Sequence, residues 1–161
     1  QDRYVTPKEH RLKMVELAVA DNPMFDVLTL EIEKEQPSLT IETLRALEGH
    51  FPTRPFFAIG LDSLLTLHTW DEYQFFGQYC QLIVIPRLHP TIRCSYDMEQ
   101  WVLKYLPELQ GSIDWLEMPL LEISSTDIRK SFQEGFFCRY FLPHQVWHYI
   151  EEHRLYQISD E

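Results

Sequence analysis

The stretch PFFAIGLDSLL, residues 55–65, joins a short apolar run to a helical pattern through Gly60. The apolar run is typical of a buried strand, and Asp62 is typical of the first turn of a helix. Two further apolar runs, QLIVIPR at 81–87 and SIDWLEM at 112–118, are each followed by a helical pattern. Strands that alternate with helices predict an α/β fold with a parallel sheet and helices on both of its faces.

The rest of the chain continues this alternation. A fourth strand is predicted for FDVLTLEIE, residues 25–33, because apolar and more polar side chains alternate there. Further helices are predicted at 6–21, 38–51, 70–80, 95–106, 125–135 and 142–155. Ligands of parallel sheets bind beyond the carboxyl ends of the strands, so the turns at 60–62, 86–87 and 124–129 are the candidate sites.

Composition narrows the function classes. The chain has 161 residues, of which 45% are hydrophobic, and this suits one domain with a packed core. A net charge of -11 disfavours nucleic-acid partners, because an acidic surface repels phosphate backbones. The three cysteines, Cys80, Cys94 and Cys138, form no disulfide framework, and no apolar run approaches the roughly 18 residues of a membrane span. We expect a cytoplasmic protein with no membrane partner.

The turn at 124–129 contains three hydroxyl residues. An apolar run with the look of a buried strand, residues 120–123, is followed by Ser124, Ser125 and Thr126, and then by Arg129. The free N–H groups of a helix N-terminus attract anions, and an arginine can add a bidentate contact to a phosphate. The alternative is an ordinary helix cap, in which one serine oxygen accepts from the backbone. These residues alone leave both interpretations open.

Several segments together resemble one enzyme family. ISSTDIR at 123–129 resembles the I-S-S-T-x-I-R motif of the bacterial nicotinate mononucleotide adenylyltransferases. PSLTIETL at 37–44, FFAIGLDSLLTLHTW at 56–70 and the closing helix at 142–156 resemble further signatures of that family, in the same order. The resemblance covers essentially the whole chain. It implies a Rossmann-like, doubly wound parallel sheet of the nucleotidyltransferase superfamily.

The resemblance also implies a reaction. The family joins nicotinate mononucleotide to ATP, assisted by Mg²⁺, and the products are nicotinate adenine dinucleotide and pyrophosphate. Members often form homo-oligomers. Three alternatives are a related adenylyltransferase for nicotinamide mononucleotide, one for pantetheine phosphate, and a non-catalytic nucleotide-binding homologue.

The residues that match the family's motifs fall into two sets. ATP would contact Gly60, Asp62, Ser124, Ser125, Thr126 and Arg129. Nicotinate mononucleotide would contact Thr40, Thr43, Trp70 and Arg87, with the indole of Trp70 stacked on the nicotinate ring.

Four of these residues also have plain structural interpretations. Asp62 and Thr40 can each cap a helix. Trp70 can be a half-buried core residue, and Arg87 can be a surface charge.

One expected feature of such a site is missing from the sequence. The family opens with a strand and the motif G-x-F-D-P-x-H-x-G-H, whose histidines contact the ATP phosphates, and these 161 residues do not contain it. We therefore assign no catalytic residue, and expect residues 1–161 to be a single nucleotidyltransferase domain that lacks its first strand–helix unit.

His144 and His148 have the spacing of helical metal ligands, yet no third ligand is evident, so we predict no metal site there.

Overall fold

The computed structural model describes residues 5–34, 36–136 and 138–157, and the chain divides into two compact units. Gln36–Glu122 forms the first, called here the sheet unit. Gln1–Glu35 and Ile123–Glu161 together form the second, called the helical unit. That the whole chain is a single domain lacking its first strand–helix unit stays a prediction.

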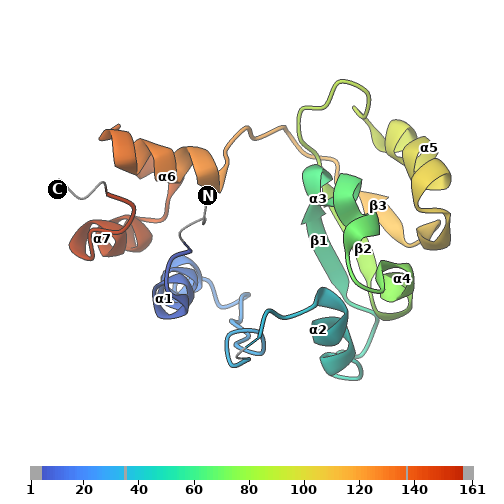
Figure 1. Cartoon of the computed structure of the whole chain (residues 1–161), viewed down its shortest axis with the longest axis horizontal. Coiled ribbons are helices and arrows are strands. Elements are labelled where there is room, and N and C mark those ends of the chain that lie inside the picture. Colours follow the sequence, from blue (N-terminus) through green and yellow to red (C-terminus); the bar gives the residue numbers. More distant parts are fainter. Residues whose placement is uncertain (1–4, 35, 137, 158–161) are drawn as a thin grey trace. The chain divides into compact units, whose positions relative to one another are not determined.

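The sheet unit contains three parallel strands, which lie side by side in Figure 1. They are β1 (Phe56–Gly60), β2 (Gln81–Ile85) and β3 (Ile113–Trp115), in the order β1-β2-β3. Each of the three comes from an apolar run that predicted a strand. The prediction of an α/β fold with a parallel sheet is therefore confirmed.

The sheet unit also contains several helices. The α-helices are α2 (Thr40–Ala46), α3 (Leu61–Thr66), α4 (Phe76–Tyr79) and α5 (Ser95–Tyr105), and the 3₁₀ turns are η1 (Leu67–Thr69), η2 (Tyr73–Phe75) and η3 (Pro107–Leu109). Helix α3 packs against β1 and β2, α4 packs against β2, and α5 packs against β3, beside which it lies in Figure 1.

One face of the sheet forms the core. Ile59 pairs with Val84 in the register and Leu82 pairs with Ile113, so that these side chains lie on one face, and all four are buried. Side chains at the alternate positions of the strands, such as Asp114, point to the other face and are more exposed. The period of two along each strand therefore separates a core face from a wetter face.

The predicted helix at 70–80 is interrupted in the structure. Glu72 adopts a left-handed backbone conformation, with φ of 51°, and only Tyr73–Phe75 and Phe76–Tyr79 are helical. A left-handed residue cannot continue a right-handed helix, so the chain turns between Trp70 and η2.

The helical unit contains α1 (Lys8–Val19), α6 (Ser125–Glu134), α7 (His144–Glu152) and the 3₁₀ turn η4 (Arg139–Phe141). Helices α1 and α7 pack together. The ring of His10 on α1 hydrogen-bonds through Nδ1 to the hydroxyl of Tyr149 on α7, at 2.8 Å.

The prediction of a strand at 25–33 is wrong. The N–H groups of Ile32 and Glu33 donate to the carbonyl of Thr29, at 2.9 and 3.1 Å, which is a turn. A strand needs a neighbouring strand for its hydrogen bonds, and alternation alone does not supply one. The apolar run at 120–123 is likewise no strand, and the side chain of Leu120 is 49% exposed.

Within the described ranges, no helix is long and apolar enough to cross a bilayer.

The three cysteines are free thiols with different accessibility. Cys94 is exposed, whereas Cys80 and Cys138 are buried. Burial raises the pKa of Cys80 to about 11 and also raises the pKa of Cys138, so both remain protonated at neutral pH. We expect a maleimide to modify only Cys94 in the folded protein, as judged by mass spectrometry. Cys94→Ser should abolish the rapid modification, and rapid labelling of that variant would contradict the buried positions of the other two.

Candidate functional site

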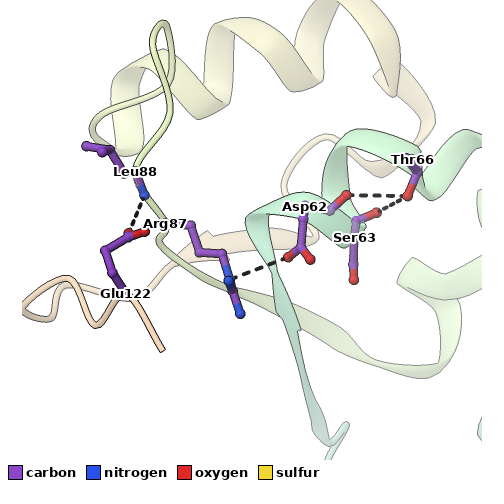
Figure 2. Close-up of polar contacts among 6 residues, drawn as sticks. All are labelled: Asp62, Ser63, Thr66, Arg87, Leu88 and Glu122. Carbon is purple, nitrogen blue, oxygen red and sulfur yellow. Dashed lines mark hydrogen bonds and ion pairs between the residues drawn. The ribbon is translucent and has the colours of Figure 1, made fainter. Parts of the chain in front are cut away.

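A charged pair lies at the carboxyl ends of β1 and β2. Asp62 is in the first turn of α3, directly after β1, and Arg87 follows β2. Their side chains point toward each other, with Asp62 Oδ1 3.8 Å from Arg87 Nε (Figure 2). The carboxylate is 70% exposed and the guanidinium 41%. Because this pair is long and solvated, it contributes little to stability, and a ligand can separate it at low cost.

Gly60 provides the space for the Asp62 carboxylate. A Cβ atom at Gly60 would lie 2.3 Å from Asp62 Oδ1, which is far inside van der Waals contact. The backbone of Gly60 has φ of -71° and ψ of 156°, a conformation open to any residue. The glycine therefore permits this close approach of the carboxylate, and no special backbone angle requires it.

Glu122, in the segment that follows β3, also contacts this edge of the sheet. Its Oε1 accepts a hydrogen bond from the N–H of Leu88, at 3.1 Å, next to Arg87 (Figure 2). The contact fixes the chain after β2 to the segment that follows β3. Sequence reasoning missed this residue, although it lies directly before the ISST motif.

An open pocket of about 260 Å³ lies beside Trp70. It is lined by Ser38, Leu39, Thr40, Thr69, Trp70 and Asp71. The indole of Trp70 is half-buried and meets the ring of Phe76 edge-on, with centroids 6.2 Å apart. The indole thus has both a packing role and a place in a pocket wall.

An ion pair connects the two sides of this pocket. Arg45 on α2 binds Glu72 in a bidentate manner, with Nη1–Oε1 at 3.0 Å and Nη2–Oε2 at 2.7 Å. Thr40 lies on the same helix, and Trp70 lies two residues before Glu72. The ion pair therefore fixes the position of α2 relative to the loop that carries the indole.

This ion pair predicts a pH-dependent stability. The hydrogen bonds from Arg45 lower the pKa of Glu72 below its ordinary value of 4.5. A lowered pKa in the folded state stabilises the protein above the unfolded pKa, and this contribution is lost as the pH falls through the folded pKa. We expect Glu72→Gln to lower the thermal unfolding temperature slightly at pH 7 and not at strongly acidic pH. Glu48→Gln, at another exposed glutamate, is the control, and an equal effect of both changes would contradict the role of the pair.

Ser124 is a helix cap in the helical unit. Its Oγ accepts from the N–H of Asp127 at 3.0 Å and donates to Asp127 Oδ2 at 2.5 Å. Arg129 Nη2 donates to Thr126 Oγ1 at 3.3 Å, and Ser125 is exposed at the start of α6. The cap interpretation of Ser124 is confirmed.

Comparisons with known proteins identify the family. The cytidylyltransferase-like family matches residues 1–131. The chain belongs to the cytidylyltransferase-like family. It is 40% identical over 157 residues to a probable nicotinate-nucleotide adenylyltransferase of Symbiobacterium thermophilum, covering 97% of this chain and 74% of that protein. It is 42% identical over 161 residues to a protein of the same name from Pectobacterium atrosepticum, covering 91% of this chain and 74% of that protein.

Solved structures agree on the fold of this cytidylyltransferase-like chain. A Plasmodium falciparum nicotinic acid mononucleotide adenylyltransferase complexed with APC has a TM-score of 0.69 at 21% identity, covering 94% of this chain and 77% of that one. The same enzyme complexed with NaAD has a TM-score of 0.66 at 20% identity, covering 97% and 77%. The Rossmann-like fold expected from the motifs is confirmed.

The predicted site residues of this cytidylyltransferase-like chain lie in both units. Gly60, Asp62, Arg87, Thr40, Thr43 and Trp70 belong to the sheet unit, and Ser124, Ser125, Thr126 and Arg129 belong to the helical unit. Within the sheet unit, the structure brings Gly60, Asp62 and Arg87 together, and it brings Thr40 and Trp70 to one pocket. Thr43 is half-buried on α2 and is not among the residues of that pocket wall.

Sequence reasoning missed the other polar members of the Trp70 pocket. Ser38, Thr69 and Asp71 flank the residues that the motifs had selected. Their position beside Thr40 and Trp70 in the sequence was the available signal. In the described part of the chain, no three His, Cys, Asp or Glu side chains form a group that could hold a metal ion.

Proposed function

We propose that the protein transfers the adenylyl group of ATP to nicotinate mononucleotide, with nicotinate adenine dinucleotide and pyrophosphate as products. The observation that carries this proposal is the 40% identity to a probable nicotinate-nucleotide adenylyltransferase along 97% of the chain. The pocket shared by Thr40 and Trp70 supports it, because an indole and hydroxyl groups suit a pyridine ring with a polar substituent.

Catalysis of this reaction depends on the alignment of the two substrates and on the stabilisation of charge, more than on a covalent intermediate with the enzyme. A phosphate oxygen of the mononucleotide forms a bond to the α-phosphorus of ATP, and the bond from that phosphorus to the bridging oxygen of pyrophosphate breaks. Phosphoryl transfers of this kind depend on alignment and on stabilisation of charge.

The protein's residues have separate roles in this proposal. Asp62 accepts hydrogen bonds from ribose hydroxyls, and the close approach at Gly60 sets the position of its carboxylate. Arg87 contributes positive charge near the phosphates. Trp70 stacks on the nicotinate ring, and Thr40 and Thr43 contact its carboxylate.

The first turns of α6 supply the residues proposed to bind the phosphates of ATP. Ser125, Thr126 and Arg129 bind the phosphates of ATP, and Ser124 holds the first turn of the helix in place through its cap. The capping hydrogen bond uses Ser124 and leaves the exposed Ser125 hydroxyl to face a ligand.

We propose that Mg²⁺ enters with ATP. Mg²⁺ keeps several waters and binds mainly to substrate phosphates with one or two carboxylates. This fits a described set of residues with no cluster of three metal-ligating side chains. Bound Mg²⁺ would neutralise phosphate charge. Cytoplasmic location and a homo-oligomeric state belong to the same proposal, and we expect no nucleic-acid partner because of the net charge of -11.

Pyrophosphate release tests the proposal against its alternatives. The full chain would receive ATP, Mg²⁺ and, separately, nicotinate mononucleotide, nicotinamide mononucleotide or pantetheine phosphate. We expect release with the nicotinate substrate. Release with only one of the other two would favour the corresponding related enzyme. Release that appears only after a strand–helix unit with the G-x-F-D-P-x-H-x-G-H motif is added at the N-terminus would assign catalysis to that motif. Binding of nucleotides without any release, even with this unit added, would favour the non-catalytic homologue.

Trp70→Ala should weaken the binding of nicotinate mononucleotide. Loss of a stacked aromatic ring costs about 1–3 kcal/mol, which is about 5- to 150-fold in Kd. Calorimetric titration of the two proteins measures this difference directly. Trp70→Phe keeps an aromatic face beside Phe76 and should retain most of the affinity. Unchanged affinity in Trp70→Ala would limit the indole to a packing role.

A further inference from the structure

Although the sequence alone predicted no metal site here, we propose that His144 and His148 form a two-imidazole binding site for a divalent transition metal ion with square-planar or tetragonal geometry, Cu²⁺ or Ni²⁺. Both residues lie on α7, one turn apart. Their Nε2 atoms are 3.0 Å from each other, and their ring centroids are 4.2 Å apart at an interplanar angle of 79°. The two Nε2 atoms are therefore close enough to bind one ion together.

Two imidazole nitrogens this close need a hydrogen atom or a metal ion between them. Two neutral rings that presented lone pairs to each other would repel. A proton on one ring can fill this place, and then one Nε2–H donates to the other Nε2. A metal ion replaces that proton and accepts both lone pairs, because neutral imidazole nitrogen is a common ligand of divalent transition metals.

The separation of the nitrogens indicates the kind of metal. With metal–nitrogen bonds of about 2.0–2.1 Å, two ligands at about 90° lie about 2.9 Å apart, and two tetrahedral ligands lie about 3.4 Å apart. The observed 3.0 Å is closer to the right-angled arrangement. Right-angled nitrogen ligation is typical of Cu²⁺ and Ni²⁺, whereas Zn²⁺ prefers the tetrahedron.

The surroundings leave the other coordination positions open to water. Both histidines are exposed, and the buried side of α7 is formed by Val146, Trp147 and Ile150. The described residues provide no third metal-ligating side chain in a group with this pair. The site is thus an open chelate at the surface, made of two residues that have no role in the proposed adenylyl transfer, and the net charge of -11 favours the approach of cations.

Binding at this site depends on the helix. The spacing of four residues brings the rings together only when α7 is folded, because an extended chain separates them. A ligand that binds only the folded state stabilises it in proportion to the logarithm of its concentration. Cu²⁺ should therefore raise the thermal unfolding temperature of the chain.

The test uses the full chain, CuCl₂ and four variants. His144→Gln and His148→Gln each remove one ligand. The double variant Gln145→His, His148→Gln keeps the number of histidines and destroys their spacing. His50→Gln, at an exposed histidine in the sheet unit, is the matched control. Calorimetric titration and electron paramagnetic resonance of Cu²⁺ report affinity and the number of coordinated nitrogens.

We expect the wild-type chain and His50→Gln to bind one Cu²⁺ through two nitrogens, with equal affinity. The three variants that break the pair should bind at least about tenfold more weakly and lose the shift in unfolding temperature. Equal affinity in all five proteins would overturn the proposal and leave only adventitious binding. Absence of binding by the wild-type chain would overturn it as well, and the pair would then share only a proton.

Discussion

Gly60→Ala is expected to weaken ATP binding by about 10- to 150-fold while the protein stays folded. The new Cβ would lie 2.3 Å from Asp62 Oδ1, so the carboxylate must leave its place beside Arg87. A hydrogen bond to a charged group contributes about 1.5–3 kcal/mol, and this is the contribution that a displaced carboxylate would lose. The φ of -71° suits alanine, so the backbone need not change.

A double-mutant cycle separates this effect from general damage. Asp62→Ala removes the carboxylate itself and should weaken ATP binding to a similar extent. If Gly60 acts through Asp62, the double variant should bind no more weakly than either single variant. Calorimetric titration with ATP and thermal unfolding of each protein provide the two readouts. Full affinity in Gly60→Ala, or additive losses, would contradict the coupling.

Phe76→Ala is expected to lower the free energy of unfolding by about 3–5 kcal/mol. Phe76 is 0% exposed at the start of α4, and its ring meets the Trp70 indole in a T-shaped arrangement. Its removal leaves a large cavity in the core that supports the pocket wall. Equilibrium unfolding in urea measures the loss.

The adjacent residue offers a matched control for this measurement. Phe75 is 37% exposed, and Phe75→Ala should have a much smaller effect, since the cost of truncation depends on burial. Phe76→Leu should be intermediate, because it keeps part of the volume. Equal losses for the truncations at 75 and 76 would contradict the assignment of Phe76 to the core.

Two kinds of residue in the candidate site could be found from the sequence: charged residues that follow a strand, and a residue that caps a helix. Asp62 and Arg87 follow apolar strands directly, and the rule that ligands bind beyond the carboxyl ends of parallel strands selects such positions. Ser124 precedes a helical pattern, and a cap role was one of its two interpretations. These features depend on residues that are near each other in the chain.

Other parts of the site needed the folded chain. The hydrogen bond from Leu88 to Glu122 joins residues 34 apart, and no local pattern specifies it. The ion pair of Arg45 and Glu72 likewise spans 27 residues, and it accompanies a left-handed glutamate that interrupts a predicted helix. A pattern of apolar residues cannot predict such a break, because the compensating contact comes from another element.

By itself, the sequence determined the three parallel strands, most of the helices and the family. Apolar runs and helical periods are local signals, and the buried face of a strand follows from its alternation. Only the tertiary structure decided that residues 25–33 are no strand, because a strand needs a neighbouring strand for its backbone hydrogen bonds. It also decided the distances between Asp62 and Arg87 and between His144 and His148, since side-chain geometry follows from the packed backbone and rotamers and not from spacing alone.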